Sequence, residues 1–262
     1  MKKIFTLITF IGFFSSFAFT QEEKKNSDTT RINLKNKEVI IIEKDDTVTI
    51  FNSKKKSQAH WAGVDFGFTT LMNSSFDNSF SDYPYWKNDP AKSAVWNLNL
   101  FDYKFNIAKH YFGLTTGLGF SFASVGFRDN YIINHTPDTL NAFIDTLNNY
   151  TKNKLSATYL TVPLLLEFNT NAKFSKSFYF SAGVVGGVRI GSSIKRKGEI
   201  AGEKFVQRVK GTQGLNAFKL DALVRVGYSH WGAFASYSLL PLFDEDKTVA
   251  VYPLTFGLSF TF

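Results

Sequence analysis

The chain has 262 residues, of which 17% are aromatic, and phenylalanine alone contributes 29. It contains no cysteine, which excludes disulfide bonds and cysteine-ligated metal sites. The formal net charge of +8 is modest for this length and is spread over predicted loops, so nucleic acid is not an expected partner.

The first twenty residues have the order of a secretory signal peptide. Two lysines supply a positive start, residues 4–14 form an apolar run, and small residues such as Ala18 end it. The run is too short to cross a bilayer, which needs about 20 apolar residues. We therefore predict a signal peptide over residues 1–20, with cleavage before Gln21.

Residues 21–59 are polar and of mixed charge, with two short apolar runs. The runs at 39–42 and 47–51 are separated by a turn-prone segment and could pair as a hairpin, but an isolated hairpin is marginal in water. We predict a mostly flexible extension over 21–59, followed by a β domain over 60–262.

From residue 60 onward, apolar residues recur at every second position. At the end of the chain, large apolar residues alternate with small ones at Leu254, Phe256, Leu258, Phe260 and Phe262. Successive side chains of a strand point to opposite faces, so each such segment has one apolar face and one face rich in Gly, Ser and Thr. The second face suits a narrow barrel interior, with the apolar face directed at lipid.

Eight segments of this kind can be counted, each long enough to cross a bilayer as a tilted strand. They cover residues 61–72, 94–107, 111–127, 155–168, 177–191, 215–229, 231–241 and 250–262. In the second segment the apolar phase changes near Leu100 and Phe101, which predicts a β-bulge. Pro163 lies inside the fourth segment and removes one ladder donor, so we expect a bulge or bend there as well.

The connections between these segments alternate in length. Short or moderate connections alternate with long ones, and the long ones cover residues 73–93, 128–154 and 192–214. Outer-membrane barrels combine short periplasmic turns with longer external loops. The sequence therefore predicts an all-β fold, an eight-stranded antiparallel transmembrane β-barrel in the outer membrane, with the extension over 21–59 in the periplasm.

Three segments resemble motifs of a known family, namely HWAGVDFG at 60–67, YLTVPLLLEF at 159–168 and YSLLPLF at 237–243. They are similar to recurring motifs of the PorT-like outer-membrane β-barrel family of Bacteroidetes, and the resemblance covers residues 60–262. It implies the fold and the location but little about activity, although some members serve protein secretion. The end of the chain, with Phe260 and Phe262, resembles the signal that barrel assembly machinery reads, which makes that machinery an expected partner.

The strand phases place six charged residues on the inward face, namely Asp65, Glu167, Arg189, Lys219, Asp221 and Arg225. Charges in a narrow barrel must be paired or hydrated, because burial of an isolated charge is costly. Eight strands leave room only for side chains or one small ligand. We therefore expect a salt-bridged plug, with an ion path or gate as the alternative.

The third predicted external loop has a basic cluster consisting of Lys195, Arg196, Lys197, Lys204, Arg208 and Lys210. Its partners could be outer-membrane lipid, through the phosphates of lipopolysaccharide, or an acidic protein of the envelope. A solvated loop without a ligand is the simpler interpretation.

Aromatic residues near the predicted strand ends include Trp61, Trp86, Trp96, Tyr159 and Trp231. Amphipathic rings prefer the headgroup level of a membrane, so we predict aromatic belts, with some rings such as Trp86 packing within a loop instead.

The four histidines, His60, His110, His135 and His230, are scattered over strand ends, turns and a loop. A barrel hydrolase would need a histidine beside a serine or carboxylate, and the sequence does not bring such partners together. We expect surface histidines, no catalytic residue, no metal and no cofactor. The leading function is a non-enzymatic barrel with a structural or interaction role through its loops and extension. A small pore or secretion accessory is the alternative, and a lipid-modifying enzyme is a remote one.

Overall fold

The computed structural model describes residues 29–34, 37–44, 47–54, 59–128, 130–136, 138–146, 148–200, 203–244 and 246–262. The chain divides into two units, Met1–Lys56 and Ser57–Phe262. The predicted signal peptide lies outside the described residues. No helix in the described part of the chain is long and apolar enough to cross a membrane.

The first unit contains an antiparallel sheet of three strands, β1 (Thr29–Leu34), β2 (Lys37–Lys44) and β3 (Thr47–Lys54). Strands β2 and β3 form the hairpin considered for the two apolar runs. Strand β1 was not predicted, although Thr29 pairs with Ile42 and Leu34 with Lys37. It is short and mostly polar, so its sequence has no clear alternation.

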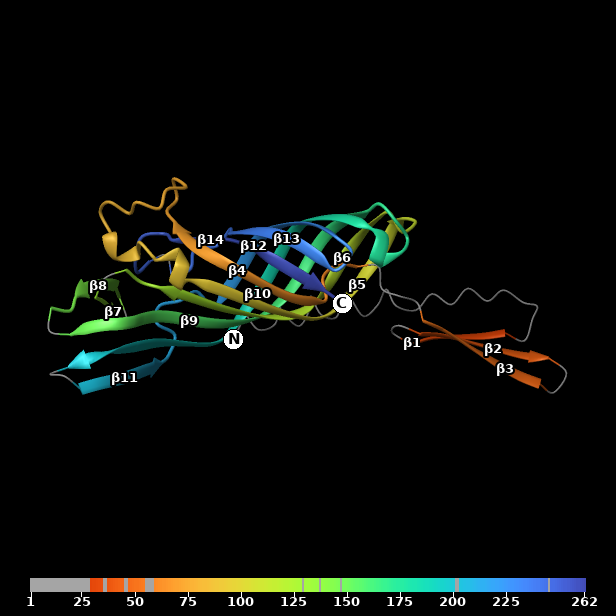
Figure 1. Ribbon diagram of the computed structural model, residues 1–262, viewed down its shortest axis with the longest axis horizontal. Coiled ribbons are helices and arrows are strands. Elements are labelled where there is room, and N and C mark those ends of the chain that lie inside the picture. Colours follow the sequence, from red (N-terminus) through yellow and green to blue (C-terminus); the bar gives the residue numbers. More distant parts are fainter. Residues whose placement is uncertain are drawn as a thin grey trace. The chain divides into compact units, whose positions relative to one another are not determined.

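The second unit is a closed antiparallel barrel of eight strands (Figure 1). Its strands are β4 (Gly63–Met72), β5 (Ala94–Ala108), β6 (Phe112–Gly126), β9 (Asn149–Asn169), β10 (Phe178–Ile200), β12 (Phe218–Tyr228), β13 (Trp231–Ser238) and β14 (Tyr252–Thr261). Each strand pairs with the next, and β14 pairs with β4 to close the ring. The predicted eight-stranded antiparallel barrel is confirmed.

The two ends of the barrel differ in their connections (Figure 1). At the end that we call the turn end, the connections are residues 109–111, 170–177 with helix η3 (Phe174–Lys176), and 229–230. At the opposite end, the loop end, the longer connections contain helices η1 (Pro84–Trp86) and η2 (Pro90–Lys92) and the hairpin of β7 (Tyr131–His135) and β8 (Leu140–Ile144). The alternation of short and long connections is therefore present.

Strands β9 and β10 continue past the loop end, where β10 pairs with β11 (Glu203–Lys210) (Figure 1). Residues 149–156, 193–200 and 203–210 together form what we call the projecting sheet. The prediction that 128–154 and 192–214 are loops is therefore wrong for these strands. Their outward positions carry lysines in place of apolar residues, so the alternation was not recognised.

The barrel faces follow the predicted alternation. In β14 the side chains of Phe256 and Leu258 are 57% and 64% exposed, whereas those of Ser259 and Thr261 are buried. The bulge predicted in β5 is confirmed by a register shift between Asn99 and Phe101 against β6. As a result the large apolar side chains on both sides of the shift are exposed on the outer surface.

The bulge expected at Pro163 is absent, and the alternative of a local bend stays a prediction. Strand β9 stays in continuous register with β10, where Pro163 lies opposite Val185. On the other side, pairing with β6 is interrupted between Leu164 and Thr161, but the register is the same before and after the gap. Proline lacks a backbone N–H, and its effect here is a local gap in the pairing with β6. No extra residue is inserted into β9.

Gly63 lies where β4 pairs with the closing strand β14. Its φ of +155° is rarely adopted by other residues, and a Cβ at this position would overlap the backbone oxygen of Phe260 in the closing strand.

We expect Gly63→Ala to lower the free energy of unfolding by about 1–3 kcal/mol, the usual range for overpacking. Urea unfolding in lipid vesicles, followed by tryptophan fluorescence, measures this loss. Gly191→Ala is the matched control, because a Cβ there has no atom within 4 Å, and equal losses in both variants would contradict the prediction.

Candidate functional site

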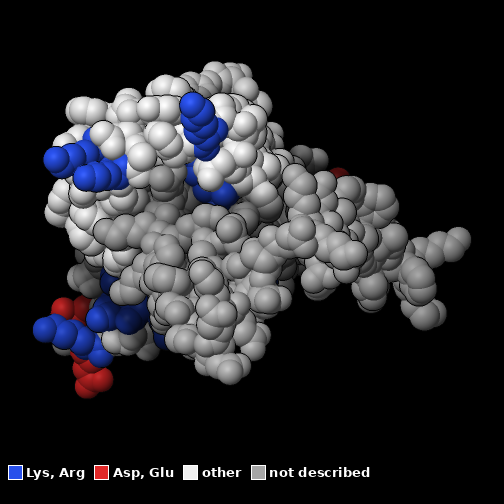
Figure 2. All heavy atoms as spheres, turned by 90° about the vertical axis from the view of Figure 1, so that its right-hand side faces the viewer, with Lys and Arg blue, Asp and Glu red and all other residues white. Residues whose placement is uncertain are grey.

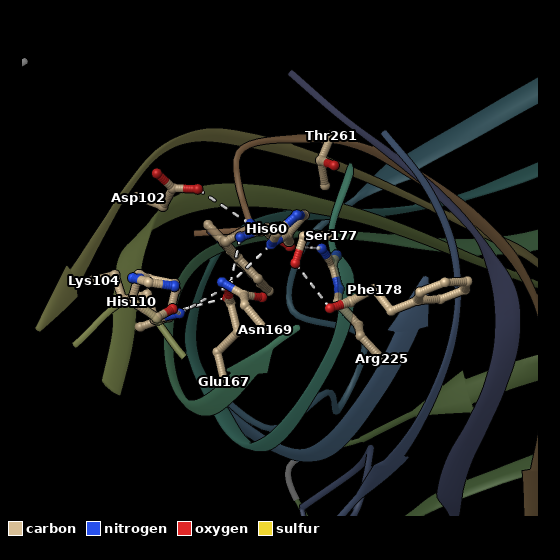
Figure 3. A network of polar contacts seen from close by, with 12 residues as sticks. His60, Asp102, Lys104, His110, Glu167, Asn169, Ser177, Phe178, Arg225 and Thr261 are labelled. Atoms are coloured by element: carbon tan, nitrogen blue, oxygen red, sulfur yellow. Dashed lines mark hydrogen bonds and ion pairs between the residues drawn. The ribbon is translucent and has the colours of Figure 1, made fainter. Parts of the chain in front are cut away.

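Polar and aromatic side chains converge inside the barrel near the turn end (Figure 3). They come from the segment 59–62 just before β4 and from strands β4, β5, β9 and β12. We call this group the turn-end cluster, and its charged members and histidine are His60, Asp65, Asp102, Lys104, Glu167 and Arg225.

Glu167 on β9 is the main hydrogen-bond acceptor of the turn-end cluster. The carboxylate is fully buried and lies 3.1 Å from the His60 backbone nitrogen and 3.1 Å from its Nδ1. It also accepts from the Thr115 hydroxyl at 3.1 Å and the Asn169 amide at 3.0 Å. Lys104 Nζ is 3.5 Å away. An ionised carboxylate can only accept hydrogen bonds, so the protonated Nδ1 of His60 is the donor in its hydrogen bond to Glu167.

Asp65 on β4 and Arg225 on β12 form a second buried ion pair through the Nη2 of Arg225. The other terminal nitrogen of Arg225 donates to the backbone carbonyl of His60 at 3.1 Å. Asn99 donates to Asp65 at 3.0 Å. Both charges are thus paired and hydrogen-bonded, which buried charges require.

The ring of His60 is held between two aromatic rings. Phe174 of the turn between β9 and β10 stacks on it at a centroid distance of 4.2 Å, and Tyr179 of β10 stacks on the other side at 4.0 Å. His60 is 1% exposed, so the prediction that the histidines lie at the surface is wrong for this residue. The sequence placed it at a strand start, and its inward position depends on contacts with three other strands.

The backbone of the next two residues is also fixed from the barrel wall. Asp102 of β5 accepts from the backbone nitrogens of Trp61 at 3.2 Å and Ala62 at 2.8 Å. The Trp61 ring is 3% exposed and lies 4.8 Å from the guanidinium of Arg225, in the geometry of a cation–π contact. Segment 59–62 is therefore bonded to side chains from strands on different sides of the ring.

The arrangement does not have the parts of a catalytic triad. Such a site needs a nucleophile hydrogen-bonded to the second ring nitrogen of the histidine. The Nε2 of His60 has no hydrogen-bond partner within the described residues, and its ring faces are covered. Among the same residues there is also no group of three or more His, Cys, Asp or Glu placed to hold a metal ion. The turn-end cluster is a buried network of ion pairs and hydrogen bonds.

A separate charge pair lies farther toward the loop end. Lys219 Nζ is 2.9 Å from Asp221, which also accepts from the Ser238 hydroxyl at 2.6 Å. The ammonium group lies 5.5 Å from the centroid of the Tyr159 ring. An internal cavity between this pair and the turn-end cluster is lined by residues of both groups, including Asp65, Asp221 and Lys219.

Five of the six predicted lumen charges therefore lie inside the barrel, in two groups. The sixth, Arg189, lies on the inward side of β10, between the exposed Val188 and Ile190, but it bonds to residues of the loop end. It donates to the carbonyl of Thr212 at 2.6 Å and to the Ser192 hydroxyl at 3.3 Å. Asp102 and Lys104 also point inward and were not predicted from the sequence. The phase change recognised at Leu100 and Phe101 was the signal that could have found them, since it turns both residues inward.

The loop end differs, because apolar side chains of the long connections and of the strands pack together there. Trp86 of η1 is fully buried, its ring lies 4.4 Å from that of Phe243, and its Nε1 donates to the Thr248 hydroxyl at 3.0 Å. The same core includes Leu71, Phe80, Val125, Phe127, Ile133, Leu140, Leu155, Leu215 and Val251. Loops that are separate in sequence thus share one apolar core.

The predicted aromatic belt is only partly present. Trp96 and Trp231 are 53% and 67% exposed on the outside of the barrel. Trp61 and Tyr159 are buried in the interior, so the prediction is wrong for them. Trp86 packs among the loops, which was the stated alternative for that residue.

The projecting sheet separates the predicted basic cluster into two faces. The outward face of this sheet carries Lys195, Lys197, Lys204, Arg208 and Lys210. Within each strand these residues are an even number of positions apart, and Lys195 of β10 pairs directly with Arg208 of β11, so all five point to one side. Arg196 points to the other face, is 8% exposed and lies 3.4 Å from Gln207. Figure 2 shows blue and red side chains gathered at the lower left, the level at which Figure 1 draws β11.

The family model described as "Outer membrane protein beta-barrel domain" matches residues 57–247, which is more than half of the 262-residue chain. No curated protein is similar enough to count as a relative. Among solved structures, the chain is similar to the attachment invasion locus protein Ail of Yersinia pestis, with 14% identity and a TM-score of 0.30, over 77% of this chain and 99% of Ail. Ail in complex with the heparin analogue sucrose octasulfate gives 13% identity and a TM-score of 0.32, over 76% of this chain and 96% of Ail.

Arg225→Met tests the buried pair of the turn-end cluster. The substitution leaves the buried carboxylate of Asp65 without its cation, so we expect the free energy of unfolding to fall by about 3–5 kcal/mol. The double variant Asp65→Asn/Arg225→Met removes both charges and recovers part of the loss. Arg189→Met is the control, with a loss of no more than roughly 1 kcal/mol because its partner carbonyl is exposed. Urea titration of the four proteins in the same vesicles checks the order, and an Arg225→Met protein as stable as the control would refute the account.

Proposed function

The chain belongs to the outer membrane protein beta-barrel domain family, and from this premise we propose that it is a closed outer-membrane anchor that interacts through its loop end and N-terminal unit. It is an integral β-barrel of the outer membrane. The motifs at 60–67, 159–168 and 237–243 support placing it in the PorT-like group of Bacteroidetes.

The observation that carries this proposal is the filling of the barrel interior. At the turn end, segment 59–62 is held inside by the carboxylates of Glu167 and Asp102 and by the guanidinium of Arg225. At the loop end, Trp86 and its apolar core pack between the long connections and the ends of the strands. An eight-stranded barrel has room for side chains or one small ligand, so these two layers leave no continuous water path. The role of the barrel is then to position what lies outside the membrane.

The orientation follows from the lengths of the connections. Outer-membrane barrels have short turns in the periplasm and longer loops outside. The turn end would then face the periplasm, and the N-terminal unit, which precedes β4 at that end, would lie in the periplasm within reach of envelope proteins. The projecting sheet and the β7–β8 hairpin would face the exterior.

Planar-bilayer recording tests the closed lumen. We expect the reconstituted full chain to show no single-channel steps, because ion pairs and rings occupy the turn end. A porin of known conductance, inserted into the same membrane, shows that steps would be detected. Reproducible steps from this protein would support the small-pore function in place of the anchor.

Cysteine labelling tests the orientation, and the absence of native cysteine makes it specific. Lys204→Cys in the projecting sheet and Lys173→Cys in a turn-end connection both replace exposed side chains. A membrane-impermeant maleimide added to whole cells should label position 204 and leave position 173 unlabelled, and lysis should make both reactive. Labelling of position 173 alone in whole cells would reverse the proposed orientation.

A further inference from the structure

One face of the projecting sheet carries a dense set of cations from three strands. Five come from β10 and β11, and β9 adds Lys152 and Lys154, which the sequence analysis did not include. We call this set the basic face, and it consists of Lys152, Lys154, Lys195, Lys197, Lys204, Arg208 and Lys210.

Burial confirms that these residues share a face. The residues between them, Asn153 on β9 and both Ile194 and Arg196 on β10, are at most 8% exposed and point the other way. The basic residues of β11 are exposed. Glu199 is the acidic residue on this face within the described part of the three strands.

The cations of the basic face repel one another, because several of them are paired directly across neighbouring strands. Lys195 lies directly between Lys154 on one neighbouring strand and Arg208 on the other, and Lys197 lies opposite Lys152. Like charges directly opposite in a sheet are destabilising. The pKa of Lys195 is lowered chiefly by the charge of Lys197, then by burial, and further by Arg208 and Lys152. A bound anion would relieve this repulsion.

The basic face continues the lipid-facing surface of the barrel. On β9 the outward side chains from Phe168 to Val162 are apolar and about half exposed. Leu160, Thr158 and Ser156 follow on the same side, and then Lys154. From Leu160 to Lys154 is about 20 Å along the strand, or roughly 15 Å along the membrane normal for a strand tilted by about 40°. The cations therefore lie about 15 Å beyond the apolar belt, on the same side of the strand.

We propose that the basic face binds the phosphorylated saccharide headgroups of lipid in the outer leaflet, whose acyl chains pack on the apolar side chains of β9 below. Lysine ammonium groups and the fork of Arg208 donate charge-assisted hydrogen bonds to phosphate oxygens. A soluble polyanion would not require a basic face aligned with the lipid-facing side of the strand. This inference rests on the proposed orientation of the loop end.

The test compares two triple variants of the full chain in zwitterionic detergent. Lys152→Gln/Lys195→Gln/Lys197→Gln alters the basic face, and Lys109→Gln/Lys173→Gln/Lys176→Gln removes the same charge from exposed lysines of the turn end. Calorimetry measures binding of lipopolysaccharide, of its deacylated phosphorylated saccharide, of that saccharide after dephosphorylation, and of a sulfated oligosaccharide. Heat-dependent mobility on gels confirms that both variants are folded.

We expect the basic-face variant to bind the phosphorylated ligands about 5- to 100-fold more weakly, since three exposed charge contacts are lost. The turn-end variant should bind like the wild type. The acylated ligand should bind more tightly than the deacylated one, and dephosphorylation should abolish binding. Equal affinities of the two variants, or no binding by the wild type, would overturn the proposal.

Two further outcomes distinguish lipid binding from binding of a soluble polyanion and from the closed-lumen proposal. A sulfated oligosaccharide that binds as tightly as the acylated ligand would assign the basic face to a soluble polyanion and would overturn the lipid assignment. The conductance measurement is independent of all these titrations. A conducting barrel that still binds phosphorylated lipid through the basic face would refute the closed lumen alone.

Discussion

The structure depends on one constraint, namely that every backbone N–H and C=O within a hydrocarbon layer must find a partner in the protein. The pairing of β14 with β4 meets it by removing the last open edge. Closure with eight strands leaves a narrow interior, and this width determines the rest. Charged side chains inside must pair at short range, as Asp65 and Arg225 do, because bulk water is not there to solvate them.

The two ends of the interior solve the same packing problem with different chemistry. The turn end has few residues in its connections, so its filling comes from wall side chains bonded to segment 59–62. The loop end has long connections, and their apolar side chains pack with strand residues such as Leu71 and Val125 in a core around Trp86. The polar layer is specific in geometry, because each carboxylate has named donors. The apolar layer gains stability from buried area and depends less on any one contact.

Features with a local cause could be predicted from the sequence. The strands, their outward faces and the bulge at Leu100 and Phe101 follow from alternation, which is a property of neighbouring residues. The inward pairing of His60 with Glu167 could not be predicted, because it joins residues 107 positions apart. The projecting sheet was also missed. Alternation there is between lysine and buried residues such as Ile194, a pattern that resembles a charged loop.

The bulge in β5 also makes the strand sensitive to residue number. One extra residue lets the strand expose large apolar side chains along its whole length and still turn Asp102 and Lys104 toward the interior. Deleting a single residue at Leu100 would exchange the two faces of everything that follows in the strand. Lys104 would then face lipid, at a cost that is about 2–4 kcal/mol at the membrane midplane and smaller toward the turn end, where Lys104 lies. This stretch therefore tolerates a change of side chain far better than a change of length, and relatives should vary here by substitution and not by insertion or deletion.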